Sequence, residues 1–244
     1  MHVNSTEIQN NFGKYLMMSL QEDIIITKNG REVAKLSAIH DKTSVEDAAS
    51  AVNEGAADYI YSGRKATYEE YLKLVENSEE RYEYIDGEIY FLASPKTTHQ
   101  IVLKELFVIF YNWFQGKKCT PMIAPYDITL KRDENDINIV QPDLMVICDL
   151  EKNLNEDDYY TGIPTLVVEI ISEYTRRKDF VKKLDLYMTC GIQEYWIVNP
   201  YNKEVTIFLF RDKDIYKNIT FRGHETAKSF VFQGLTADLK KVFG

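Results

Sequence analysis

Apolar positions in residues 1–40 repeat first at helical and then at strand spacing. Residues 5–16 begin with Ser and Thr, which cap helices, and continue with apolar side chains at helical spacing. A strand at 24–27, an Asn29-Gly30 turn and a returning strand at 33–39 then predict a β-hairpin. The pattern indicates a small α+β unit. Because about 40 residues is near the lower limit for independent folding, we expect oligomerisation to stabilise it.

A second pattern begins near residue 67 and predicts a larger unit. Thr67 and Glu70 fit a capping box before a helix at 68–78. Asp86-Gly87 marks a turn between two short strands, and 97–114 is apolar almost all round, as a deeply packed helix would be. The remaining pattern predicts strands at 122–130, 144–150 and 166–171, a helix from about 175 to 189, and a meander over 194–223. Helices and strands around a mixed sheet indicate an α/β or α+β domain.

The composition changes once, between these two units. Residues 41–60 are acidic, rich in Ala and Ser, and lack large side chains until their end. A solvated helix would also have this composition, but a linker fits the position between two patterned segments better. We therefore predict domains at 1–42 and 65–244, joined by a linker at 43–64.

Charge and composition limit the function classes. The formal net charge of −9 argues against a protein that holds nucleic acid through a bulk positive field. No apolar run approaches the roughly 20 residues of a membrane span, and the start of the chain has no secretory-signal pattern, so we expect no membrane partner. Cys119, Cys148 and Cys190 show no paired spacing. We expect neither a zinc site nor a disulfide, and a cytoplasmic protein.

One carboxylate interrupts an apolar strand. Glu169 lies inside 166–171, which otherwise has the composition of a strand buried on both faces, and Asp143 precedes the apolar strand before it. A buried carboxylate must be hydrogen-bonded, neutralised or paired with a cation. Two readings remain open: an ion pair between Glu169 and a following cation, or a divalent cation shared with Asp143. Hard oxygen ligands favour Mg²⁺ or Mn²⁺ in the second case.

Four segments of the larger unit resemble the Uma-two family of restriction-endonuclease-like proteins, which have the PD-(D/E)XK nuclease fold. The segments are YEYIDGEIY, SPKTTHQ, QPDLMVI and LVVEIISEYTRRKDFVKKLDLYMTCGIQEYWIVNP, within about residues 67–200. The resemblance implies a mixed sheet flanked by helices. It also implies that Asp143 and Glu169 are metal ligands, with the Ile170 carbonyl as a third ligand and Glu83 completing the site.

The chain departs from the family pattern at the motif's lysine. That lysine should lie two residues after Glu169, where this chain has Ile171. A hydrolase of this type needs a cation or a base near the attacking water. In the superfamily the lysine can migrate to a neighbouring helix. We therefore assign it to Lys183, with Asp179 one turn earlier on the same helix face, and keep Lys182 as the alternative.

Other polar residues near these motifs carry less specific signals. His99 matches the family's His after the Ser-Pro segment and would contact phosphate or orient Glu83; a core histidine is the equal alternative. Arg176, Arg177 and Lys178 are either a solvated helix start or phosphate contacts. Cations are unfavourable at a helix N-terminus, which slightly favours the second reading. Three aromatic side chains of the same region are expected in the core: Tyr187, Tyr195 and Trp196.

Residues 3–39, above all the piece ITKNGREVAKL, resemble the N-terminal domain of the Phd/YefM antitoxin family. The resemblance implies a dimeric DNA-binding module and a cognate toxin as partner. Acidic and basic residues are balanced over 1–40, so a module that only dimerises is the alternative. In both cases we expect a homodimer or a higher homo-oligomer.

Together these features predict a metal-dependent endonuclease that hydrolyses DNA phosphodiester bonds, with Mg²⁺ or Mn²⁺ as cofactor, fused to an antitoxin-like module. The alternative is a non-catalytic DNA-binding regulator or antitoxin whose nuclease-like domain is inert. The presence of Asp143, Glu169 and Lys183 favours the enzyme.

Overall fold

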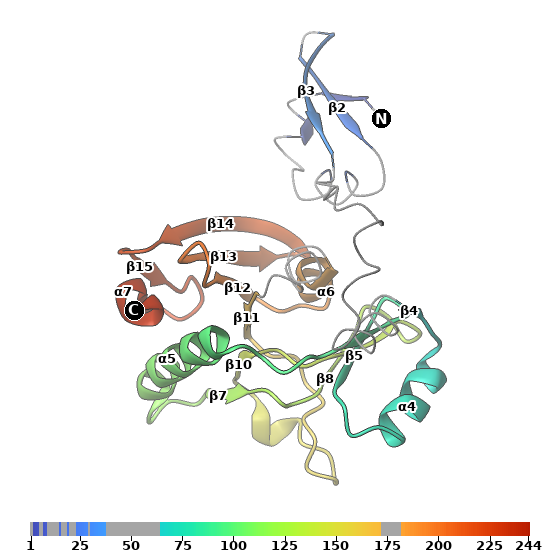
Figure 1. Ribbon diagram of the computed structural model, residues 1–244, viewed down its shortest axis with the longest axis vertical. Coiled ribbons are helices and arrows are strands. Elements are labelled where there is room, and N and C mark those ends of the chain that lie inside the picture. The colour runs from blue at the N-terminus through green and yellow to red at the C-terminus, as the bar shows by residue number, and fades with distance from the viewer. Residues whose placement is uncertain are drawn as a thin grey trace, which may run out of the picture. The chain divides into compact units, whose positions relative to one another are not determined.

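The computed structural model divides the chain into two compact units, Met1–Glu54 and Gly55–Gly244 (Figure 1). It describes residues 2–4, 7–8, 15, 19, 23–28, 30–37, 64–171 and 182–244. Nearly all of the predicted linker at 43–64 lies outside this part of the chain.

The N-terminal unit contains a three-stranded sheet. Its strands are β1 (His2–Asn4), β2 (Ile24–Lys28) and β3 (Arg31–Leu36), in that order. β1 pairs parallel with β2, and β2 pairs antiparallel with β3, which confirms the predicted hairpin. Gly30 in the hairpin turn has a φ of +74°, a conformation that glycine adopts without steric cost. Among the described residues of this unit, Val3, Ile8, Tyr15 and Ile24 are buried together in one hydrophobic cluster.

The larger unit is built on a six-stranded mixed sheet. Its strands are β7 (Thr120–Ile123), β10 (Leu144–Ile147), β11 (Leu166–Ile170), β12 (Glu194–Asn199), β13 (Glu204–Arg211) and β14 (Asp214–Arg222). Their order in the sheet is β14-β13-β12-β11-β10-β7. β11 pairs parallel with β12, whereas the other neighbours pair antiparallel, so the mixed sheet and the meander after residue 194 are both as predicted.

A second sheet of five strands lies in the same unit. Its strands are β4 (Arg64–Lys65), β5 (Tyr82–Ile85), β6 (Glu88–Phe91), β8 (Ile128–Lys131) and β9 (Ile137–Val140). The order is β4-β6-β5-β9-β8. β5 and β6 form the hairpin predicted at Asp86-Gly87. A further pair, β15 (Thr226–Lys228) and β16 (Thr236–Asp238), lies near the C-terminus.

The described helices of the larger unit agree with most of the sequence signals. They are α4 (Tyr68–Glu76), α5 (Thr97–Phe114), the 3-10 helix η2 (Leu150–Lys152), α6 (Leu184–Thr189) and α7 (Leu239–Phe243). The capping box of α4 is confirmed, because the Glu70 amide donates to the Thr67 hydroxyl and the Glu70 carboxylate accepts from the Thr67 amide. Of the described helices, none combines the length and apolar character needed to cross a bilayer.

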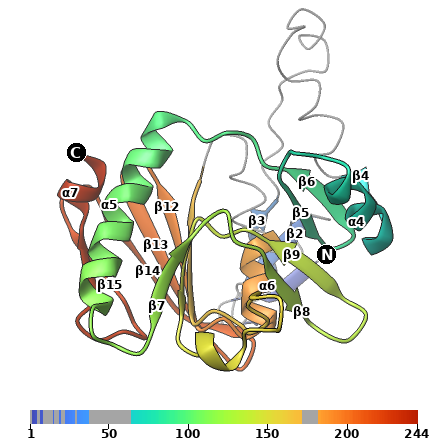
Figure 2. The same ribbon diagram turned by 90° about the horizontal axis from the view of Figure 1, so that it is seen from below.

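The strand β11 is buried on both faces, as its apolar composition predicted. Leu166, Val168 and Ile170 face a core that contains the buried side of α5. Val167 lies in a different core, together with the buried residues of α6. Figure 2 shows α5 lying along β12 and β13, well separated from α6. Because side chains alternate along a strand, Glu169 points to the same side as Val167, toward α6.

Three expectations from the sequence need correction or restriction. The segment predicted as one strand at 122–130 is two strands, β7 and β8, which belong to different sheets. The residues between the two strands include Pro125 and Asp127, so the sequence did carry a signal of the break, which the prediction did not use. Cys119 and Cys148 form a disulfide, so the expectation of no disulfide is wrong. These two cysteines flank the paired strands β7 and β10, a relation that the sequence spacing does not reveal. Of the helix predicted at 175–189, the described part is α6.

Candidate active site

Asp143 and Glu169 lie opposite each other on neighbouring strands. In the antiparallel pair β10–β11, Leu144 is the partner of Val168, and continuing this register by one residue places Asp143 opposite Glu169. Directly opposed side chains on one face of a sheet have Cβ atoms roughly 5 Å apart. Asp143 also contacts the next residue of β11, because the Ile170 amide donates to Asp143 Oδ2 at 2.7 Å. The strand pairing thus brings together the two acidic residues singled out from the sequence.

The carboxylate of Glu169 is buried and is contacted by one donor from α6 and one from the residue just before it. Lys183 Nζ donates to Glu169 Oε1 at 2.7 Å, and the Tyr187 hydroxyl donates to the same oxygen at 2.6 Å. Residues four apart lie on one face of a helix, which explains why Lys183 and Tyr187 reach one oxygen. Glu169 thus forms an ion pair, and its partner is Lys183, the lysine preferred from the sequence. The second reading, a divalent cation shared with Asp143, stays a prediction.

A second carboxylate shares the same ammonium group. Glu83 on β5 places its Oε1 2.7 Å from Lys183 Nζ, and the side chains of Lys183 and Glu83 are only 3% and 0% exposed. Glu83 Oε1 also accepts a hydrogen bond from the Gln141 amide at 2.9 Å. Lys183 therefore connects a carboxylate of the five-stranded sheet with Glu169 of the six-stranded sheet. The attraction of the Lys183 ammonium group for each carboxylate and the hydrogen bonds oppose the cost of desolvation, whereas the two carboxylates repel each other.

His99 lies beside Asp143. Its Nε2 is 3.1 Å from Asp143 Oδ2, and both side chains are mostly buried, at 15% and 19% exposed. His99 belongs to the first turn of α5, whose packing against the six-stranded sheet brings it to the end of β10. The described contact is suited to orient Asp143. A contact of His99 with phosphate stays a prediction.

Lys182 points to a different carboxylate from Lys183. It forms an ion pair with Glu88 on β6, and the Tyr90 hydroxyl donates to the same Glu88 oxygen. Partial burial alone would raise the pKa of Glu88, but the hydrogen bonds from Lys182 and Tyr90 outweigh it and hold the pKa below its usual value. Of the two candidate lysines, Lys183 is thus the one placed between Glu83 and Glu169.

Four residues of the sequence prediction lie outside the described residues: Arg176, Arg177, Lys178 and Asp179. Their assignment to phosphate contacts or to support of the site stays a prediction.

Two residues that contact the acidic groups were not predicted from the sequence to do so. Tyr187 was expected only in the core; it is fully buried, as are Tyr195 and Trp196, but its hydroxyl also binds Glu169. The available signal was its position four residues after Lys183. The second is Gln141, whose main-chain amide binds Glu83. No side-chain pattern could have revealed that contact, because any residue except proline supplies an amide donor.

The donor set at the ends of β10 and β11 suits a small hard cation. The Asp143 and Glu169 carboxylates and the Ile170 carbonyl offer only oxygen atoms. Among the described residues of the chain, no group of three or more His, Cys, Asp or Glu side chains lies close enough together to hold a metal ion without other ligands. Mg²⁺ is usually held by one or two carboxylates and completes its shell with water and substrate phosphate. These residues therefore fit Mg²⁺ or Mn²⁺, and lack the nitrogen and sulfur ligands of a structural zinc site.

Comparison with known proteins identifies the class of the larger unit. The sequence profile of the Uma2 family, described as “Putative restriction endonuclease”, matches residues 68–240, and the chain belongs to this family. A Synechocystis sp. protein named “Uncharacterized protein slr1290” is 30% identical over 145 residues, which are 59% of this chain and 74% of that protein.

A solved structure from Anabaena variabilis, described as a “putative nuclease belonging to DUF820”, shares the fold. Its TM-score is 0.57 at 20% sequence identity, and the match covers 72% of this chain and 97% of that one. The nuclease-like α+β fold of the larger unit is thereby confirmed. The Phd/YefM resemblance of residues 3–39 stays a prediction.

Proposed function

We propose that the larger unit is an endonuclease that hydrolyses DNA phosphodiester bonds and requires Mg²⁺ or Mn²⁺. The observation that carries the proposal is the buried Lys183 ammonium group, which lies 2.7 Å from both Glu83 and Glu169, next to the strand end that bears Asp143. A cation held between carboxylates beside a hard-oxygen donor set is what phosphodiester hydrolysis needs near an attacking water. Membership of the Uma2 family supports the same reaction class.

The acidic residues would bind the metal and, through it, position the substrate phosphate. Asp143, Glu169 and the Ile170 carbonyl are the proposed ligands. When bound, the metal supplies polarisation of the scissile phosphate and a lowered pKa of a coordinated water. His99 and Tyr187 each contact one carboxylate and would fix its orientation, as residues behind metal ligands commonly do.

Lys183 would supply the positive charge that the family motif normally places at the position of Ile171. The two flanking carboxylates favour its charged form in a site that is almost closed to solvent. Its ammonium group can donate a hydrogen bond to the attacking water or to a phosphate oxygen that gains negative charge in the transition state. Glu83 contacts the same ammonium group as Glu169 and would help to keep Lys183 in place.

We further propose that the N-terminal unit is a Phd/YefM-like module that dimerises the chain and brings it to DNA in the cytoplasm, with a cognate toxin as a further partner. Its support is the motif resemblance and the small number of residues in the unit, which oligomerisation would help to stabilise. Light scattering of the full chain tests dimerisation. A gel shift with full-length Glu169→Gln tests DNA binding without cleavage.

The decisive assay for the enzyme compares DNA cleavage by the wild type, Asp143→Asn and Glu169→Gln. We expect the wild type to cleave plasmid or single-stranded DNA with Mg²⁺ or Mn²⁺, to stop in EDTA, and to lose activity in both variants. Arg222→Ala, in an exposed ion pair with Glu204, is the control. Equal inactivity of all proteins with every substrate and metal, together with retained DNA binding, would favour the inert regulator.

A further inference from the structure

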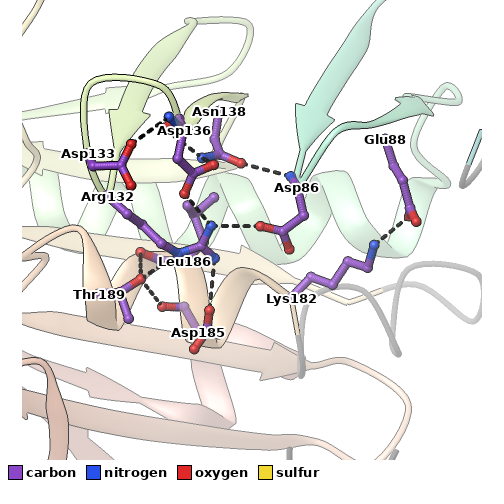
Figure 3. Close-up of polar contacts among 10 residues, drawn as sticks. All are labelled: Asp86, Glu88, Arg132, Asp133, Asp136, Asn138, Lys182, Asp185, Leu186 and Thr189. Carbon is purple, nitrogen blue, oxygen red and sulfur yellow. Dashed lines mark hydrogen bonds and ion pairs between the residues drawn. The ribbon is translucent and has the colours of Figure 1, made fainter. Parts of the chain in front are cut away.

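We propose that Arg132 is a positioning residue for Lys183, because it ties the helix that carries Lys183 to the sheet that carries Glu83. This inference rests on the proposed nuclease function for its catalytic consequence, but its structural consequence can be measured independently. Arg132 follows β8 and lies at the centre of the polar contacts in Figure 3.

The guanidinium group of Arg132 uses all three nitrogen atoms. Nη2 donates to Asp185 at 2.8 Å and Nε donates to the Thr189 hydroxyl at 2.9 Å, so two contacts reach α6. Nη1 donates to Asp86 at 2.7 Å and to Asp136 at 2.8 Å, so two contacts reach the five-stranded sheet. One side chain therefore joins α6 to the turns at the end of β5 and before β9.

The two acceptors of Arg132 near the five-stranded sheet, Asp86 and Asp136, are held by hydrogen bonds to Asn138. Asp86 has a φ of 53° in the β5–β6 turn, and its amide donates to Asn138 Oδ1 at 2.8 Å. Asn138 is fully buried on β9 and also donates to Asp136. On the sheet side, Asp86 and Asp136 are thus fixed next to the neighbouring strands β5 and β9, and Glu83 lies on β5.

The described part of the helix that carries Lys183 is tied to other segments at two points. At its N-terminal end Lys182 pairs with Glu88 of β6, and at its C-terminal end Asp185 and Thr189 bind Arg132. Lys183 lies between these two links, so the distance from its ammonium group to Glu83 depends on both.

The chemistry of the contact requires arginine. Three carboxylates and a hydroxyl surround a side chain that is 22% exposed, and lysine cannot serve four acceptors with one compact ammonium group. Networked and partly buried ion pairs contribute more than isolated surface pairs. We therefore expect a measurable local effect when the guanidinium group is removed.

The test combines amide hydrogen exchange with steady-state cleavage kinetics for wild type, Arg132→Ala, Arg132→Lys, Asp185→Asn and the control Arg222→Ala. In Arg132→Ala we expect faster exchange in the peptide covering 184–189, a kcat lowered by roughly 10-fold or more, and a KM within about twofold of wild type. Arg132→Lys should recover part of kcat, whereas Arg222→Ala should match wild type in both measurements.

Unchanged exchange in 184–189 together with unchanged kcat in Arg132→Ala would overturn the proposal, as would a loss confined to KM. If Arg132→Ala fails to fold, hydrogen exchange and kcat are measured for Asp185→Asn instead, since this variant keeps the contacts of Arg132 with Asp86 and Asp136. A wild-type protein without nuclease activity would refute the proposed function, while hydrogen exchange would still decide whether Arg132 holds α6.

Discussion

The Lys183 ammonium group lies 2.7 Å from the carboxylate oxygen Oε1 of Glu169, and the two residues are fourteen positions apart in the sequence. Both side chains are almost completely buried, at 3% and 5% exposed. Glu83 makes a second contact of the same length to the same ammonium group. The arrangement places one cation between two anions in a region of low dielectric constant, where each partner depends on the others.

Lys183→Met should destabilise the larger unit by roughly 3–5 kcal/mol, because it leaves two buried carboxylates without their cation. Adding Glu83→Gln and Glu169→Gln to Lys183→Met should restore part of that loss, since the uncompensated charges are then removed. Urea denaturation followed by circular dichroism measures both effects. Equal and additive losses in all variants would show that the three groups are not coupled.

Tyr187→Phe tests the hydroxyl that donates to Glu169. The substitution keeps the buried ring but removes the donor, so we expect Mn²⁺ affinity or cleavage rate to fall roughly 10-fold. Tyr71→Phe is a matched control, because Tyr71 is also buried and its hydroxyl donates to the Tyr82 carbonyl instead. A similar loss in both variants would indicate a general effect of the missing hydroxyl rather than orientation of Glu169.

Much of the fold followed from the sequence pattern, because the relevant signals are local. The capping box at Thr67 and Glu70, the Asp86-Gly87 turn and the buried strand at 166–170 depend on residues close together in the chain. The division of 122–130 between two sheets and the pairing of Cys119 with Cys148 depend on which strands become neighbours. Such non-local pairing is not encoded in the periodicity of either segment.

The same distinction applies to the candidate site. The resemblance to a known family singled out Asp143, Glu169 and Glu83, and helical spacing together with that family pattern selected Lys183. Neither source indicated Arg132, which lies in the β8–β9 hairpin loop outside the motifs and contacts three segments: its own loop, the β5–β6 turn and α6. A single-sequence pattern cannot reveal a side chain whose partners are brought together only by the fold.

The ion pair of Glu88 predicts a specific pH dependence of stability. Its folded-state pKa is lowered, so its contribution is complete above the unfolded pKa of about 4.3 and is lost as the pH falls through the lower folded value. Thermal melts of wild type and Glu88→Gln should therefore differ at pH 7 and converge at acidic pH. Glu105→Gln, in the more exposed pair with Lys104, is the control. A difference that grows with acidity would contradict the assignment.

Glu194 is a buried carboxylate without a role in the proposed chemistry. One oxygen accepts from the Trp196 indole, and the other accepts from Ser229 and from the amides of Phe230 and Val231. In Glu194→Gln the amide NH₂ group must face at least one of these donors. We expect a loss of roughly 1–3 kcal/mol in the free energy of unfolding, with cleavage unchanged at a temperature where the variant is folded. A stability equal to wild type would show that the four donors around Glu194 find other hydrogen-bond acceptors in the variant.

The central claim, that Lys183 supplies the cation missing at Ile171, is tested most directly by single-turnover DNA cleavage in Mg²⁺. Wild type, Lys183→Met and the neighbouring Lys182→Met are compared at a temperature where circular dichroism shows all three folded. We expect Lys183→Met to lower the rate by roughly 100-fold or more, as loss of transition-state charge stabilisation does, and Lys182→Met to stay closer to wild type. Cleavage by Lys183→Met at the wild-type rate would contradict a role of Lys183 as that cation.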